Sequence, residues 1–289
     1  MAYNGSAFFI TSSQPPKQKT VLTPMTHKTC LNCDKELTDQ FCAGCGQKAD
    51  THRISFKHFI FHDVLHGTFH IERGMLFTAT QALTRPGKAA LDYIAGKRKR
   101  FYNVFYLILI LFGVILFLKH FYHELAIAQG GHFEEAPFSD AASRKMDDIM
   151  SQKSKIIVLL FVPLAALNSF LLFRKKRLNL SEHCIIAGMM LLGIMSLSAI
   201  GHIVFYLYLL TDSDMVADIV DFGTPSLIVL YVGYGYYNAF AATYSRVGVV
   251  ARIILFFALL CLEAVALLLL LIGFVTDWKF GTVHFSPFS

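Results

Sequence analysis

Four cysteines near the N-terminus have the residue type and spacing of a metal site. Cys30, Cys33, Cys42 and Cys45 form two Cys-x-x-Cys pairs separated by eight residues. Each pair can present two thiolates to one ion, and four sulfurs satisfy the tetrahedral preference of Zn²⁺ without leaving a position for water. The pattern therefore predicts a structural zinc site. Disulfides or free thiols are the alternative, although a segment in a reducing compartment does not keep disulfides.

Four histidines follow the cysteines at steps of four residues, at His58, His62, His66 and His70. Within 56–71 they lie opposite apolar side chains that recur at helical spacing, which predicts a helix on the inner membrane surface. A pair of these histidines could share a second metal ion or respond to pH. A polar, partly solvated face is the simpler interpretation, because each four-residue step turns by about 40° and four in a row cannot converge on one ion.

A run of four cations, Lys97, Arg98, Lys99 and Arg100, stands directly before a long apolar stretch. Each cation beside an anionic leaflet contributes about 1 kcal/mol. The run therefore predicts a contact with anionic phospholipids and an anchor for the topology. We expect no nucleic-acid partner, because basic clusters next to a membrane span commonly have this simpler role.

Ionisable and amide side chains inside apolar stretches form a fourth candidate site, made of Glu263, His202 and Asn168. A charged carboxylate at the centre of a bilayer is costly, so Glu263 must be protonated, paired or next to a hydrated cavity. A pair with His202 could relay protons or hold a cation. The alternative is a hydrogen bond between helices that fixes their packing. The tyrosine-rich stretch 231–240 likewise predicts either a polar pocket or a packing face.

These groups need helices in lipid to position them. Hydrophobic residues make up 55% of the 289 residues, the mean hydropathy is +0.51 and only 16% are charged, which is too apolar for an ordinary soluble domain. Apolar stretches long enough to cross about 30 Å of hydrocarbon are expected near 102–119, 156–173, 184–210, 222–243 and 250–275. Because every backbone amide in lipid needs an internal partner, the predicted fold is all-α.

The predicted architecture is a polytopic helical membrane bundle of about five transmembrane helices, with a small N-terminal zinc-ribbon knuckle and interfacial helices. Its expected parts are a disordered tail at 1–29, zinc-ribbon knuckles at 30–50, cytoplasmic interfacial helices at 51–101 and a transmembrane domain at 102–289. Pro86 is expected to start a short helix before the basic run.

The distribution of lysine and arginine predicts the orientation of the helices. Residues 1–101, the loop 174–177 and the turn with Arg246 and Arg252 hold 20 of the 26 basic residues. Positive residues near span ends stay in the cytoplasm. We therefore expect a cytoplasmic N-terminus and an external C-terminus.

Three short motifs follow one another along the N-terminal part of the chain. They are Cys45-Gly46-Gln47 after the paired knuckles, the Thr80, Leu83, Arg85-Pro86-Gly87 pattern, and Gly96-Lys97-Arg98 with Arg100-Phe101. Together they resemble a bacterial multi-pass membrane family catalogued as domain of unknown function 3667. The similarity covers about 30–101. It implies a bacterial inner-membrane protein with a zinc-ribbon head, and it implies no activity.

We find no phosphate loop, metalloprotease motif or nucleophile elbow, and we expect no enzymatic activity. The sequence favours a membrane scaffold or regulatory subunit whose head and interfacial helices bind a protein or lipid partner, or a second copy of the chain. A small transporter or channel component using Glu263 and His202 is the alternative. An enzyme acting on lipid near the histidine-rich segment is a third option.

Overall fold

The computed structural model describes residues 28–51, 53–55, 73–128, 141–211, 215 and 218–278. The segment 56–71, with its four regularly spaced histidines, lies outside the described residues. So does the predicted tail, except for its last two positions. Within the described part the fold is helical, and pairing between extended segments is limited to two isolated bridges in the cysteine-rich segment.

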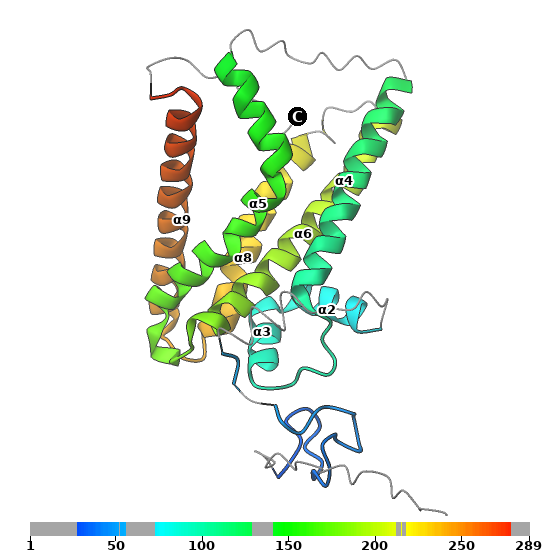
Figure 1. Cartoon of the computed structure of the whole chain (residues 1–289), viewed down its shortest axis with the longest axis vertical. Coiled ribbons are helices and arrows are strands. Elements are labelled where there is room, and N and C mark those ends of the chain that lie inside the picture. Colours follow the sequence, from blue (N-terminus) through cyan, green and yellow to red (C-terminus); the bar gives the residue numbers. More distant parts are fainter. Residues whose placement is uncertain are drawn as a thin grey trace, which may run out of the picture.

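The helices, in chain order, are α2 (Arg73–Thr84), α3 (Pro86–Ile94), α4 (Val104–Ala128), α5 (Ala141–Leu172), the short 3₁₀ helix η2 (Arg174–Lys176), α6 (Leu180–Thr211), the π-helical turn η3 (Ile219–Gly223), α8 (Thr224–Phe240) and α9 (Arg246–Val275). Figure 1 shows the long helices side by side, with the short helices α2 and α3 at one end and the cysteine-rich segment beyond them. We call residues 28–51 the head, and the end of the bundle that carries it the inner end.

Within the residues that the structure describes, three helical stretches are long and apolar enough to cross a membrane: Val104–Ala128, Leu180–Tyr208 and Arg246–Val275. They confirm three of the five predicted spans. At 156–173 the apolar part of α5 is the shorter stretch Ile156–Leu172, and at 222–243 the structure has the 17-residue helix α8, which continues from η3. Both lie beside the longer helices. The bundle therefore contains helices whose apolar part is too short to cross a membrane by itself.

Helix α6 is the centre of the bundle. In its most apolar 18-residue stretch, 78% of the residues are buried, compared with 17% in the corresponding stretch of α4 and 6% in that of α9. The outer faces of the peripheral helices carry exposed large apolar side chains, among them Phe117, Ile254 and Leu262. A surface of that kind is unfavourable in water and suits lipid, which makes this a helical membrane protein.

Local capping explains where several helices begin. Asn103 Oδ1 accepts hydrogen bonds from the backbone N–H of Phe105 at 3.0 Å and of Tyr106 at 3.3 Å, which caps α4. Ser245 caps α9 by accepting from Gly248 N. Pro86 is the first residue of α3, as predicted, because its fixed φ and missing N–H suit a first helical position.

The corner between α2 and α3 packs directly onto α8. A Cβ on Gly87 would lie 2.3 Å from the Gly235 carbonyl oxygen and 2.5 Å from Ala239 N, so only glycine permits this approach of two backbones. The Tyr231 hydroxyl donates to Ala82 O at 2.7 Å, and Asn238 Oδ1 accepts from Lys88 N at 2.8 Å. The tyrosine-rich stretch is thus a packing face that satisfies polar backbone groups at the ends of α2 and α3.

Candidate metal centre

The four cysteine sulfurs of the head lie together. All four Sγ atoms are within 4.8 Å of one another, with 3.6 Å between Cys30 and Cys45 and 3.5 Å between Cys33 and Cys42. All four are free thiols, so the disulfide alternative is wrong for this structure. Metal–sulfur bonds of about 2.3 Å in a tetrahedron place sulfurs roughly 3.8 Å apart, so the set fits one tetrahedral metal ion.

The two cysteine pairs are held by matching turns. Cys30 N donates to Lys35 O and Cys42 N to Gln47 O, both at 2.8 Å. The residue after the second cysteine of each pair has a left-handed backbone, with φ of 59° at Asp34 and 72° at Gly46. Glycine adopts this conformation readily, and the short polar side chain of aspartate tolerates it.

Backbone N–H groups point at the sulfurs and shift their acidity. Asn32 N donates to Cys30 Sγ and Gly44 N to Cys42 Sγ, both at 3.4 Å. The Gly44 N–H is the largest cause that lowers the pKa of Cys42 to about 6. The Lys35 N–H acts in the same direction on Cys33, but desolvation and the neighbouring thiols raise the pKa of Cys33 to about 12. Four crowded sulfurs therefore compete for negative charge, which a bound cation would relieve.

Gln47, two residues after Cys45, joins the head to the loop between α3 and α4. Its Nε2 donates to Gly96 O at 2.8 Å, and its Oε1 accepts from the backbone N–H of Arg98 and of Lys99, each at 3.2 Å. The side chain is buried. Gly96 has φ of 101°, and a Cβ there would meet Leu31 of the head at 2.6 Å. The Cys-Gly-Gln and Gly-Lys-Arg motifs of the sequence therefore form one contact.

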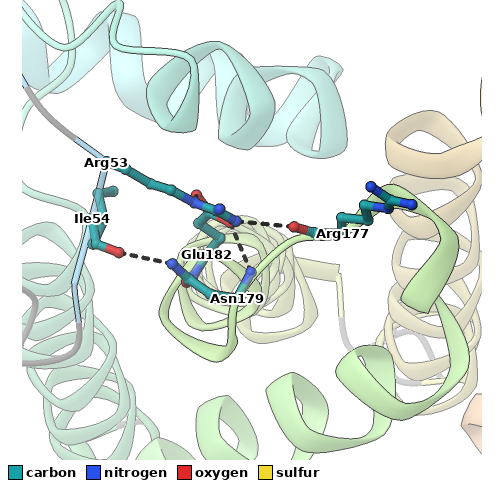
Figure 2. A network of polar contacts seen from close by, with 5 residues as sticks. All are labelled: Arg53, Ile54, Arg177, Asn179 and Glu182. Carbon is teal, nitrogen blue, oxygen red and sulfur yellow. Dashed lines mark hydrogen bonds and ion pairs between the residues drawn. The ribbon is translucent and has the colours of Figure 1, made fainter.

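Arg53 makes the second junction, with the start of α6 (Figure 2). Its Nε and Nη2 donate to the two carboxylate oxygens of Glu182, both at 2.7 Å, and Nη2 also donates to Arg177 O at 2.9 Å. The Glu182 side chain is only 3% exposed, whereas that of Arg53 is 61% exposed. The hydrogen bonds and charge of Glu182 raise the pKa of Arg53.

Asn179 extends this junction into a capping box. Asn179 N donates to Glu182 Oε2 at 2.8 Å, and Glu182 N donates to Asn179 Oδ1 at 2.9 Å, which satisfies two N–H groups at the start of α6. Asn179 Nδ2 also donates to Ile54 O at 3.0 Å, and Ile54 is buried. Sequence reasoning missed Arg53 and Glu182; the Asn-x-x-Glu spacing before an apolar run was the available signal.

The basic run is partly engaged by the protein itself. Lys97 Nζ lies 3.2 Å from the Asp92 carboxylate, and the Arg98 guanidinium lies 5.5 Å from the centre of the Tyr93 ring. Lys99 lies beside Gly46 of the head. The predicted lipid contact at Lys97, Arg98, Lys99 and Arg100 stays a prediction, and the structure adds a role for this loop in seating the head.

The three intramembrane polar residues do not form one cluster. Asn168 Nδ2 donates to Glu263 Oε2 at 2.9 Å, which links α5 to α9. His202 Nδ1 instead donates to Ser198 O of its own helix at 2.8 Å. Among the described residues no hydrogen bond or ion pair joins His202 to Glu263, so the pair considered from sequence does not form.

A buried polar group that the sequence did not single out lies near the inner end of the bundle. The Ser169 hydroxyl and His183 Nδ1 are 2.7 Å apart, and both residues are fully buried. His183 Nε2 and the Tyr236 hydroxyl have no hydrogen-bond partner in the described structure. Phe173 and Phe240 stack around them, so these polar atoms lie within an aromatic core.

Comparison with known proteins identifies one related segment. Residues 72–116 match the model of a family described as "Protein of unknown function (DUF3667)". The match covers α2, α3, the basic loop and the first part of α4. It confirms the family resemblance noted from sequence where the two overlap, at 72–101, and the cysteine motif of that resemblance lies outside the matched residues. The chain matches no curated protein and no solved structure.

Proposed function

We propose that this chain is a membrane scaffold or regulatory subunit whose zinc-loaded head, held at a fixed position on the inner end of the bundle, binds a protein partner. The observation that carries the proposal is the double attachment of the head. Gln47 fastens it to the loop before α4, and Arg53 fastens the adjoining segment to Glu182 of α6. Each attachment uses one buried side chain, Gln47 in the first and Glu182 in the second, and a head without a role at a fixed position would not need two of them.

We assign zinc as the metal. The ligand set is four thiols, which suits soft or borderline ions, and it satisfies a tetrahedral ion completely. A saturated site of this kind stabilises a fold and leaves no position for a substrate. In small zinc domains the binding free energy of the metal is folding free energy, so zinc would hold the head in the form that Gln47 attaches to the bundle.

The exposed surface of the head supports a protein partner. Phe41 lies between the two cysteine pairs, and 58% of its surface is exposed. Aromatic side chains presented in this way commonly anchor protein interfaces. We infer a bacterial inner-membrane location in which the head faces the cytoplasm and α9 ends outside, because the inner end carries most of the basic residues.

The test replaces Phe41 with a photocrosslinking amino acid in the full chain, expressed in the cells from which the protein comes. An adduct of defined mass is expected at this position, and it should disappear when Cys42 and Cys45 are both changed to serine. A crosslinker at Phe117, an exposed residue of α4, is the matched control and should give no such adduct. Absence of an adduct at Phe41, or an adduct that persists without the cysteines, would contradict the proposal.

The transport alternative needs a separate measurement. It depends on Glu263 and His202, and ion or proton flux in proteoliposomes tests it directly. Flux that falls on Glu263→Gln while the head keeps its metal would favour transport over the scaffold role. Unchanged flux, with metal-dependent crosslinking at Phe41, would favour the scaffold.

A further inference from the structure

A basic pocket lies at the inner end of the bundle, where α5 ends and α9 begins. It has a volume of about 590 Å³. Arg174, Lys175 and Arg252 line it together with the hydroxyl residues Tyr244 and Ser245, and Leu171 and Leu172 form its apolar side. Among the described residues no acidic side chain lines the pocket, so its described lining carries three cations.

The cations of the pocket are positioned by neighbouring groups. Arg252 Nε donates to Leu172 O at 3.1 Å and Nη1 to Gly248 O at 2.8 Å, while its guanidinium carbon lies 4.4 Å from the centre of the Tyr244 ring. The Tyr244 hydroxyl accepts from Lys175 N at 2.8 Å. Lys175 Nζ also lies 5.8 Å from the centre of the Tyr244 ring. The ring therefore contacts two of the three cations, and it does not neutralise their charge.

Two of the four cations in the loop 174–177, Arg174 and Lys175, line the pocket, and the other two do not. Lys176 Nζ turns away from the pocket and donates to Ala239 O at the end of α8 at 3.1 Å; burial lowers the pKa of this lysine. Arg177 provides its carbonyl to Arg53. Within the described structure no carboxylate lies within ion-pair distance of Arg174, Lys175 or Arg252, so these three lack an anionic partner.

The place of the pocket in the bundle indicates what that partner is. The candidate span of α9 begins at Arg246, so the pocket lies at the boundary between the apolar helix surface and water. Leu171 on its apolar side is nearly half exposed, and so are Leu167 of α5 and Leu255 of α9 just beyond it. A ligand that is anionic at one end and apolar along its length matches both surfaces.

We propose that this pocket binds the phosphate-bearing headgroup of an anionic phospholipid from the leaflet on the side of the head, with the acyl chains along the apolar faces of α5 and α9. Arg174, Lys175 and Arg252 contact the phosphate. The described lining of the pocket offers no carboxylate to a choline or ethanolamine ammonium group, so a headgroup without a cation is preferred. This site is separate from the basic run at 97–100 and does not depend on the role proposed for the head.

The test is native mass spectrometry of the full chain in detergent, with phosphatidylglycerol and phosphatidylcholine added at equal concentration. The variant Arg174→Gln/Lys175→Gln removes two pocket cations whose side chains make no hydrogen bond within the described structure. The control Arg177→Gln/Arg246→Gln removes the same charge at the same end, outside the pocket. We expect the wild-type chain and the control to retain phosphatidylglycerol preferentially, and the pocket variant to bind it about 30-fold more weakly, at about 1 kcal/mol per cation.

Three results would overturn the proposal. Equal losses in the pocket variant and the control would mean that only general charge matters. Equal retention of the two lipids by the wild-type chain would remove the headgroup preference. Displacement of the bound lipid by inorganic phosphate at a similar concentration would identify a site for a free anion, since phosphate lacks the apolar part that the α5–α9 surface contacts.

Discussion

Replacing Arg53 by glutamine tests whether the head segment and α6 are energetically joined. The change removes two charge-assisted bonds of 2.7 Å to a carboxylate that is 3% exposed. Removing one partner of a buried pair costs about 3–5 kcal/mol, whereas an exposed pair contributes about 1 kcal/mol or less. Because Arg53 itself is 61% exposed, water can reach Glu182 after the substitution. We therefore expect a cost between these limits, about 2 kcal/mol.

The assay is amide hydrogen exchange at the start of α6 in lipid nanodiscs. Asn179 N donates to the Glu182 carboxylate, so its protection reports the position of that side chain. A cost of about 2 kcal/mol predicts exchange about 30-fold faster for a peptide covering 177–185. Arg177→Gln is the matched control, because only the Arg177 carbonyl takes part in the network and its side chain points elsewhere (Figure 2). Unchanged exchange in Arg53→Gln, or equal acceleration in the control, would refute the coupling.

Three further outcomes are expected. Gly87→Ala should destabilise the protein by about 1–3 kcal/mol and so lower its thermal unfolding midpoint in detergent, because the added Cβ would meet the backbone of α8. Gly113→Ala should not lower the midpoint, because nothing lies within 4 Å of a Cβ at that position. Removing the metal with a chelator should speed amide exchange in the head and also at 96–99, and continued protection of that loop would argue against the Gln47 contact. Glu263→Gln should lower the thermal unfolding midpoint by less than the equivalent of about 1 kcal/mol, because an amide oxygen can still accept a hydrogen bond from Asn168 and such bonds contribute about 0.6 kcal/mol. A larger decrease would mean that the charge of the carboxylate is itself needed.

The sequence predicted the parts that depend on local pattern. Cys-x-x-Cys spacing identified the four sulfurs that the structure gathers, and apolar length identified the three helices that can cross a membrane. Proline chemistry located the start of α3 at Pro86. Each of these features is determined within a few residues or one helix, so no knowledge of tertiary contacts was needed.

Contacts between distant segments could not be predicted in this way. Arg53 and Glu182 are 129 positions apart, and their amino-acid types alone did not distinguish them from the other charged residues of the chain. Glu263 has Asn168 as its partner because α5 lies beside α9. The sequence suggested His202 only because that residue also lies inside a predicted membrane span. Which helices are neighbours is a tertiary property, and it decides the partners of polar groups in the membrane.

The way Gln47 holds the loop before α4 has a consequence for the basic residues there. Its amide bonds only to main-chain atoms, the carbonyl of Gly96 and the N–H groups of Arg98 and Lys99. Main-chain atoms are the same whatever side chain is attached, so the seat of the head places no demand on the charge at 98 and 99. The charges of Arg98 and Lys99 can therefore be removed one at a time while the head stays attached to the bundle. An effect of such a change on membrane binding can then be assigned to charge and not to loss of the head contact.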